Sequence, residues 1–284
     1  MVPSRPSQTA EAVCLLRAIE EARPAATRIL DDPYALTFLG PLSRAGLALA
    51  PLTGDLVPGL ATFVVCRHRL IDDALLAALA RTDAPIEQVV VLGAGYDARA
   101  WRFADELAGR PVFEVDFPAT QARKERILRG RDLPPADVRR IPIDFQVDRL
   151  DEVLARAGFV PGRPTFFVWE GVSMYLRREA IVATLDSLHA LGGPGSVLAM
   201  DFWFLLDNPG LRATLNRAGA RLVSLVGEPI IFALPPEEAP SLLARHGWQV
   251  SDLADAAELE RRYVRDGRRA WPAMAVLVAV RDGS

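Results

Sequence analysis

The chain of 284 residues contains very little lysine, histidine or cysteine. Lys124 is its only lysine, and three histidines and two cysteines are spread along the rest of the sequence. Two cysteines are too few for a disulfide framework or a zinc cage, which favours a reducing compartment. Chemistry that needs a lysine Schiff base or a cluster of histidines has almost no residues to use.

Strong net charge and long apolar runs are also missing. The 33 basic residues nearly balance the 36 acidic ones, which argues against a basic face that would hold a nucleic acid. The longest apolar runs, such as 86–92 and 273–280, have the length of strands and fall far short of a bilayer span. Residues 1–13 lack the apolar core of a secretory signal. We therefore expect a soluble, cytoplasmic protein that binds neither nucleic acid nor membrane.

The residues that are present suit one large α/β unit with a helical appendage. Apolar residues recur at helical spacing over 9–23 and 60–82, which predicts an N-terminal helical extension, or lid, over residues 1–84. Strands and helices alternate from residue 85 onward, which places the core at 85–284. The segment 203–235 is longer than a connection needs, and we interpret it as a lid insertion.

Seven runs within the core are typical of strands. They are 87–92, 111–116, 138–143, 165–169, 196–201, 248–253 and 273–280. Helices are predicted between them at 97–108, 118–129, 148–157, 178–191 and 236–246. Apolar strands with helical crossovers are buried on both faces, so we expect a mostly parallel sheet. The last two strands flank a shorter, charge-rich segment, which would let the final strand run antiparallel.

The sharpest local motif is VVVLGAGYDARAW, at residues 89–101. A buried strand ends at Gly93, Ala94 and Gly95, and the predicted helix follows from about Asp97. Glycines allow a ligand to approach the backbone, and a helix N-terminus offers free N–H groups. The motif favours a nucleotide-type site, with an ordinary strand-to-helix turn as the alternative.

Acidic residues follow the next two strands. Asp116 lies 21 residues beyond Gly95, a spacing at which a carboxylate commonly binds the ribose hydroxyls of an adenosine ligand. A second role, compatible with the first, is to cap the helix that Pro118 opens. Asp144 and Phe145 follow the third strand. This pair suits an adenine, because the carboxylate accepts from the exocyclic amine and the ring packs on the base.

The glycine motif with Ala98 in third place also satisfies the looser dinucleotide pattern. Two features argue against NAD. The motif lies about 90 residues into the chain, and Tyr96 and Asp97 crowd the helix start where a pyrophosphate would bind. A sulfonium nucleoside carries no phosphate and tolerates an acid at this position. We therefore favour a methyl donor of this kind.

Four motifs in this order, LGAGYDARAWRF, FEVDFPATQARKERIL, PIDFQ and FVWEGVSMYL, resemble the leucine carboxyl methyltransferase family. The upstream TAEAVCLLRAIEEARPAATRILDDPYA and CRHRLIDDAL are similar to its bacterial branch, which includes S-adenosylmethionine-dependent O-methyltransferases of polyketide biosynthesis. The resemblance implies S-adenosyl-L-methionine as the cofactor. It also implies a class I methyltransferase, Rossmann-like α/β fold: a seven-stranded, mostly parallel sheet with one antiparallel strand and an N-terminal helical lid.

The resemblance further implies which residues bind the donor. Arg67 corresponds to an arginine that pairs with the methionine carboxylate in a bidentate contact, and Arg69 is the neighbouring alternative. Glu170 matches a glutamate near the methionine part, and a glutamate that ends an apolar strand is costly without a partner. A basic residue of the lid corresponds to Arg23 or Arg28. The complete expected donor site is Arg67, Gly93, Ala94, Gly95, Asp116, Phe117, Asp144, Phe145 and Glu170.

The expected reaction is in-line methyl transfer to an oxygen of a small or medium apolar molecule that carries a carboxyl or hydroxyl group. A carboxylate is already ionised and needs no general base, which fits the scarcity of histidine. A phenol would need deprotonation, and Tyr175 and His68 are the catalytic candidates for it. Whether the protein is a monomer or a homodimer stays open.

Four aromatic residues either line the pocket or pack in the core: Phe202, Trp203, Phe204 and Phe232.

Two other functions compete with this interpretation. Ser173, between Gly171 and Tyr175, invites a serine esterase, but the nucleophile elbow requires glycine where Tyr175 stands. Only His189 and His246 follow as bases for such a serine. The second alternative is a non-catalytic relative that binds the donor without turnover.

Overall fold

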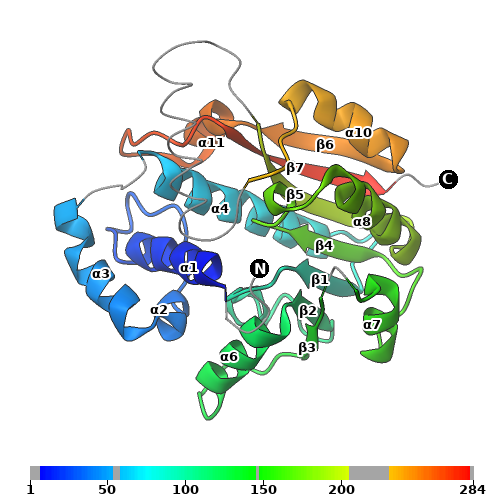
Figure 1. Ribbon diagram of the computed structural model, residues 1–284, viewed down its shortest axis with the longest axis horizontal. Helices are drawn as coiled ribbons and strands as arrows, with labels where there is room; N and C mark the ends of the chain where they lie inside the picture. The colour runs from blue at the N-terminus through cyan, green and yellow to red at the C-terminus, as the bar shows by residue number, and fades with distance from the viewer. Residues whose placement is uncertain (1–6, 54–57, 145–146, 205–229, 282–284) are drawn as a thin grey trace.

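A seven-stranded sheet forms the centre of the computed structural model, which describes residues 7–53, 58–144, 147–204 and 230–281. Figure 1 shows the strands side by side in the order β3-β2-β1-β4-β5-β7-β6. Their bounds are β1 Gln88–Leu92, β2 Val112–Asp116, β3 Val138–Pro142, β4 Thr165–Trp169, β5 Val197–Trp203, β6 Trp248–Ala254 and β7 Met274–Arg281.

The strand directions create a ligand-binding edge. Strands β1 to β5 pair in parallel, and β7 is antiparallel to both of its neighbours. The strand order reverses at β1, which lies between β2 and β4. At such a switch point the loops after neighbouring strands diverge and leave a crevice at the carboxyl ends, where α/β proteins bind ligands. The predicted mostly parallel sheet with an antiparallel last strand is confirmed.

Both faces of the sheet are buried, and for this reason its central strands are continuous apolar runs. In β1, Val89 and Val91 face one core cluster, while Val90 and Leu92 face the other. The first face is covered by α4 Leu60–Leu79 and α11 Ala256–Tyr263, and the second by α7 Leu150–Arg156, α8 Arg178–Leu191 and α10 Ala239–Arg245.

Short N-terminal helices gather at one side of the sheet, beside α6 (Figure 1). Ser7 caps the first of them, since its Oγ accepts a hydrogen bond from Ala10 N–H at 3.1 Å. Cys14 of this helix packs in a third cluster with Tyr96 and Trp101, so the helix folds against the segment that follows β1. The elements involved are α1 Gln8–Glu21, α2 Ala35–Phe38, α3 Pro41–Thr53 and α6 Pro118–Leu128.

The structure confirms the predicted strands and most of the predicted helices. The helix expected over 97–108 is wrong, because only α5 Arg99–Arg102 is helical. Phe103 leaves the helical region, at φ −119° and ψ 36°, and turns follow it. The helix expected over 236–246 divides into η2 Pro236–Glu238 and α10, and η1 Ser173–Tyr175 follows β4.

Two expectations fall outside the described residues. One is Phe145, and the other is most of the proposed 203–235 lid, since 205–229 is not described. Within the described ranges, no helix is both long enough and apolar enough to cross a bilayer.

The aromatic residues around the end of β5 pack in the core. Phe202, Trp203 and Phe232 are buried in the two main clusters, and Phe204 packs against the second of them. Of the two roles that the sequence left open, the structure supports core packing.

Gly59, which precedes α4, gives a test of how closely the start of α4 packs against the segment before β7. Its φ is +86°, and a Cβ there would lie 2.9 Å from backbone atoms of Arg269, Ala270 and Trp271. Gly59→Ala should lower the free energy of unfolding by about 2–4 kcal/mol, through strain at positive φ and steric overlap. Gly109→Ala is the control, with φ +77° and no described atom within 4 Å of the added carbon. It should cost about 1 kcal/mol in urea unfolding, and equal losses would contradict close packing at Gly59.

Candidate active site

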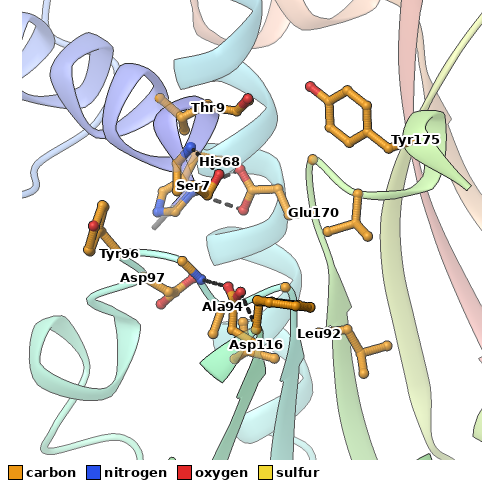
Figure 2. Close-up of a pocket in the computed structure, with 18 of the residues that line it drawn as sticks. Ser7, Thr9, His68, Leu92, Ala94, Tyr96, Asp97, Asp116, Glu170 and Tyr175 are labelled. Atoms are coloured by element: carbon orange, nitrogen blue, oxygen red, sulfur yellow. Dashed lines mark hydrogen bonds and ion pairs between the residues drawn. The ribbon is translucent and has the colours of Figure 1, made fainter. Parts of the chain in front are cut away.

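A cavity of about 240 Å³ opens at the carboxyl ends of β1, β2 and β4, beneath α1. Figure 2 shows Asp116 at its base, Glu170 and His68 at mid-height, and Thr9 of α1 and Tyr175 of η1 toward its top. Most of the residues expected from the sequence line it, namely Arg67, Gly93, Ala94, Gly95, Asp116, Phe117, Asp144 and Glu170, together with His68 and Tyr175.

The loop after β1 has no space for side chains at its two glycines. Gly93 has φ +65°, and a Cβ there would lie 2.2 Å from Val172 Cγ2. Gly95 has φ +45°, and a Cβ there would lie 3.1 Å from the Cβ of Ala10 on α1. The glycines therefore let the backbone of this loop form the cavity wall directly.

Asp116 holds this loop from the end of β2. Its Oδ2 accepts a hydrogen bond from Gly95 N–H, and its Oδ1 accepts one from Phe117 N–H (Figure 2). Burial raises the pKa of this carboxyl group. The second role, as a helix cap, is wrong, because Phe117 is the N-cap residue of α6 and no side chain caps that helix. Asp116 is instead a buried carboxylate at the base of the cavity.

Arg67 of α4 pairs with two carboxylates of the protein itself. Its Nε donates to Glu170 Oε1 at 2.9 Å, and its Nη1 donates to Asp201 Oδ2 at 2.7 Å. Asp201 also accepts from Gly171 N–H at 2.6 Å. Burial raises the pKa of Asp201, whereas in Glu170 the effect of burial is outweighed by His68, Arg99 and Arg67, which hold its pKa well below the usual value. Arg67 therefore lines the cavity with its charge already compensated.

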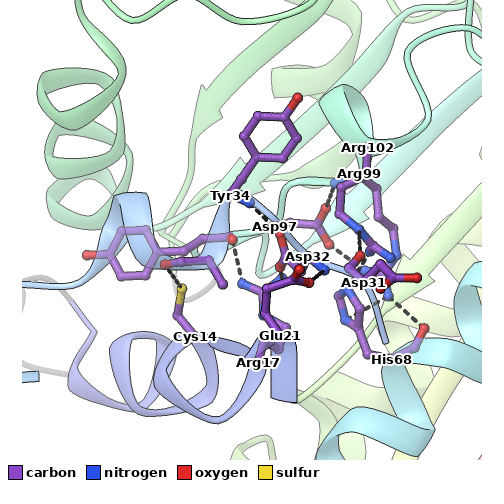
Figure 3. Close-up of polar contacts among 12 residues, drawn as sticks. Cys14, Arg17, Glu21, Asp31, Asp32, Tyr34, His68, Asp97, Arg99 and Arg102 are labelled. Carbon is purple, nitrogen blue, oxygen red and sulfur yellow. Dashed lines mark hydrogen bonds and ion pairs between the residues drawn. The ribbon is translucent and has the colours of Figure 1, made fainter. Parts of the chain in front are cut away.

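Arg99 of α5 extends these ion pairs toward the loop after β1. Its Nη2 donates to Glu170 Oε2 at 2.8 Å and its Nε to Asp72 Oδ1 at 2.7 Å, and it also pairs with Asp97. Figure 3 shows Arg99 beside Asp97, with Arg102 and His68 next to it. Burial acts against ionisation of Asp97, but Arg99 and the other nearby cations lower its pKa to about 2. The loop, α4 and the end of β4 are thus joined by one buried set of charges.

His68 is engaged through both ring nitrogens. Its Nε2 lies 3.1 Å from Arg102 Nη1, which is only a donor, so Nε2 is the acceptor of that hydrogen bond. In the neutral ring the proton is then on Nδ1, which lies 3.0 Å from Glu170 Oε2. Arg99 Nη2 lies 2.9 Å from the same nitrogen, so protein groups contact both ring nitrogens. Burial and the adjacent Arg99 lower the pKa of His68. The neutral imidazole orients Glu170 and has no lone pair directed at the cavity.

Arg17 of α1 lines the cavity although the sequence analysis did not single it out. Its Nη2 donates to the carbonyl oxygen of Tyr96 at 2.6 Å, and its Nη1 lies 2.9 Å from Asp32 Oδ2 (Figure 3). Its Nε is buried and has no hydrogen-bond partner among the described residues. The available signal was its position, since Ala10, Val13 and Arg17 follow helical spacing on the cavity side of α1.

The other candidate arginines are bound elsewhere. Arg23 pairs with Glu20, Arg28 pairs with Glu21, and Arg69 pairs with Asp73. The described residues that line the cavity include none of these three arginines. Of the two α4 arginines, Arg67 is the one that lines the cavity, and Arg17 is the arginine of the N-terminal segment that does so among the described residues.

The esterase hypothesis is wrong. The side chain of Ser173 is buried, and its hydroxyl donates to the carbonyl oxygen of Asp201 at 2.6 Å. His189 packs against the ring of Trp248, and His246 Nδ1 lies 2.6 Å from Asp186 Oδ1. Neither contact is with the serine, which serves to fix η1 to β5.

The sheet order and the cavity at its switch point define a class I methyltransferase fold. Two solved structures share it along nearly their whole length. One, described as "a putative methyltransferase from Thermobifida fusca", has a TM-score of 0.63 at 16% identity, covering 98% of this chain and 96% of the other. A DUF574 family protein of Streptomyces avermitilis has a TM-score of 0.61 at 17% identity, covering 95% and 97%. At these identities the likeness concerns the fold.

The sequence comparisons identify the family. The model of the leucine carboxyl methyltransferase family matches residues 10–189. A relative from Parafrankia sp. (strain EAN1pec) is 34% identical over 263 residues, covering 89% of this chain and 81% of its own length. A relative from Streptomyces coelicolor is 34% identical over 260 residues, covering 86% and 81%. Both carry the name "Putative S-adenosyl-L-methionine-dependent methyltransferase". The chain belongs to the leucine carboxyl methyltransferase family.

The neutral state of His68 predicts a pH dependence of stability. Because the folded protein lowers the pKa of His68 below its usual 6.5, the unfolded chain binds a proton that the folded chain excludes. The free energy of unfolding should fall as pH drops below about 6.5, by about 1.4 kcal/mol per pH unit until the folded pKa is reached. His68→Asn should remove this part of the slope in urea titrations between about pH 7.5 and 5. His246→Asn is the control, and parallel curves for the wild type and His68→Asn would contradict the assignment.

Proposed function

We propose that this enzyme transfers the methyl group of S-adenosyl-L-methionine to a carboxylate or hydroxyl oxygen of a small, apolar molecule of the secondary-metabolite type. One observation carries the proposal. The switch point of the sheet brings Gly93, Gly95, Asp116 and Asp144 together in one cavity, which Arg17 of α1 also lines.

The base of the cavity suits the nucleoside part of the donor. Gly93 and Gly95 present backbone, and the Asp116 carboxylate has lone pairs beyond the two that the backbone N–H groups use. Ribose hydroxyls would donate to these lone pairs. Asp144 and Phe117 also line this part of the cavity and would contact the adenine. The role expected for Phe145 stays a prediction.

The upper part suits the amino-acid end of the donor. Arg67 is already bound by Glu170 and Asp201, so its positive charge is compensated. Arg17, which also lines the cavity, has one ion-pair partner, Asp32, against two for Arg67, and we assign the methionine carboxylate to its guanidinium. Arg67 then has a positioning role, because it fixes Glu170 at the cavity wall.

The charge of the cavity suits a sulfonium ion. Of the described residues that line it, four are acidic, Asp97, Asp116, Asp144 and Glu170, and two are arginines. When bound, the donor supplies an activated methyl group, so the protein has to align the acceptor oxygen and exclude water. His68 has no lone pair directed at the cavity. An acceptor that is already ionised, such as a carboxylate, therefore fits this site better than one that requires a general base.

Binding of the donor tests the assignments of Asp116 and Arg17. In calorimetric titrations with S-adenosylmethionine we expect saturable binding by the wild type and a dissociation constant about tenfold or more higher for Asp116→Asn and Arg17→Met. Arg17→Met leaves Asp32 without its ion-pair partner, so Arg17→Met/Asp32→Asn controls for the buried charge. Arg23→Met should bind as the wild type does. Absence of binding by the wild type, or equal loss in Arg23→Met, would contradict the proposal.

The pH dependence of turnover tests the class of acceptor. With a labelled methyl group on the donor, transfer to carboxylic acids should be nearly constant between about pH 6 and 9, because these acids stay ionised throughout. Transfer to phenols should rise with pH as the phenolate forms. A profile for carboxylic acids that needs a group with a pKa within this range would show that a general base takes part. Donor binding without transfer to any member of a broad panel would favour the non-catalytic alternative.

A further inference from the structure

The only lysine of the chain, Lys124, is completely buried on α6. Its Nζ donates to the carbonyl oxygen of Asp97 at 2.8 Å and pairs with Glu114 Oε2 at 2.8 Å. Asp97 belongs to the loop after β1 and Glu114 to β2, so a single ammonium group joins α6, the loop and the sheet. A buried ammonium is retained in a fold only when partners such as these compensate its lost hydration.

Aromatic rings complete the surroundings of this ammonium group. Nζ lies 5.5 Å from the ring centre of Trp101 and 5.9 Å from that of Phe38, within the range of cation–π attraction. The guanidinium of Arg140 faces Trp101 as well, at 5.6 Å. A second planar guanidinium in place of Lys124 would need more space and a fork of acceptors. The single position at which the chain has lysine and not arginine is therefore one where a compact cation is required.

The contact with Asp97 adds a second support to the loop. Asp116 accepts from Gly95 N–H, and Lys124 donates to the carbonyl oxygen of Asp97, two residues further on. Both supports come from the continuous unit of β2 and α6. The segment between them lines the cavity, whereas Lys124 lies behind the loop, outside the described residues that line it. Any effect of Lys124 on a ligand therefore acts through the loop.

We propose that Lys124 is a positioning residue for the methyl donor. By holding the Asp97 carbonyl oxygen, it keeps the loop 93–97 in the conformation that receives the nucleoside. This inference rests on the proposed function, because it takes S-adenosylmethionine as the ligand. The competing explanation is that Lys124 only neutralises the buried Glu114, whose pKa burial raises.

Paired variants separate the two roles. Lys124→Met removes the ammonium and leaves Glu114 buried without its main partner, so it should lower the melting temperature. Lys124→Met/Glu114→Gln removes both charges and should recover part of that loss. Glu114→Gln alone keeps the bond from Lys124 to Asp97. The readouts are the melting temperature and the dissociation constant for S-adenosylmethionine by calorimetry at a temperature where each variant is folded.

The two roles give opposite results for the double variant. If Lys124 positions the loop, Lys124→Met/Glu114→Gln binds S-adenosylmethionine about tenfold or more weakly, while Glu114→Gln binds as the wild type does. Lys124→Gln/Glu114→Gln, which keeps an N–H donor without charge, should retain more affinity than the Met variant. Leu185→Ala, a cavity in the core beneath α8, is the stability-matched control and should keep full affinity.

The proposal is overturned if the dissociation constant of Lys124→Met/Glu114→Gln is within about twofold of the wild-type value. Loss of a charged hydrogen bond that positions the loop should change this constant by more than that. It is also overturned if Leu185→Ala loses affinity in proportion to its lost stability. Amide hydrogen exchange gives a second measurement on the same variants. The amides of residues 95–97 should exchange faster in both Met variants, and unchanged protection would likewise overturn the proposal. Failure of the wild type to bind S-adenosylmethionine is a separate result, which contradicts the proposed function itself.

Discussion

The buried ion pairs between Arg67, Glu170 and Asp201 hold together the elements from which the cavity is built. Arg67 lies in α4, Glu170 follows β4, and Asp201 lies within β5, so two ion pairs tie one helix to the ends of two neighbouring strands. Loss of one partner from a buried ion pair costs about 3–5 kcal/mol, because the remaining charge has no compensation. A ligand that drew Arg67 away would leave the buried Asp201 without its cation, and Glu170 would keep Arg99 alone.

The remaining walls are fixed by contacts of the same kind. Arg99 links Glu170 to Asp97 in the loop after β1, and Asp116 binds the same loop through Gly95 N–H. Helix α1 lies over the cavity, and Arg17 attaches it to the loop after β1 by donating a hydrogen bond to the Tyr96 carbonyl oxygen. Because these contacts join groups of the protein itself, they hold the cavity walls in place and lower the binding energy that a ligand must spend on ordering them.

Sequence patterns predicted the sheet well because its central strands are buried on both faces and stand out as apolar runs. Gly93, Asp116 and Glu170 could be placed in one site because each follows a strand, and the carboxyl ends of parallel strands meet at one edge. The partners of Arg67 could not be predicted in this way. Glu170 and Asp201 lie 103 and 134 residues further along the chain, and no local pattern connects them to Arg67.

Two other features were also not predicted from the sequence. The helix after the glycine loop was predicted too long, because the apolar spacing of 97–108 does not reveal that the backbone leaves the helix at Phe103. Arg17 was missed because an arginine on an amphipathic helix normally faces solvent, and only the fold shows that this side of α1 faces the cavity. The charge pairs between residues far apart in the chain could be predicted from the sequence less well than the helices and strands.

A crystal structure of the complex with S-adenosylhomocysteine tests the central claim most directly. We expect the adenosine between the loop 93–97 and Asp116, the ligand carboxylate at Arg17, and Arg67 still paired with Glu170 and Asp201. A ligand bound outside this cavity, or a ligand carboxylate held by an Arg67 that has left both of its partners, would contradict the claim.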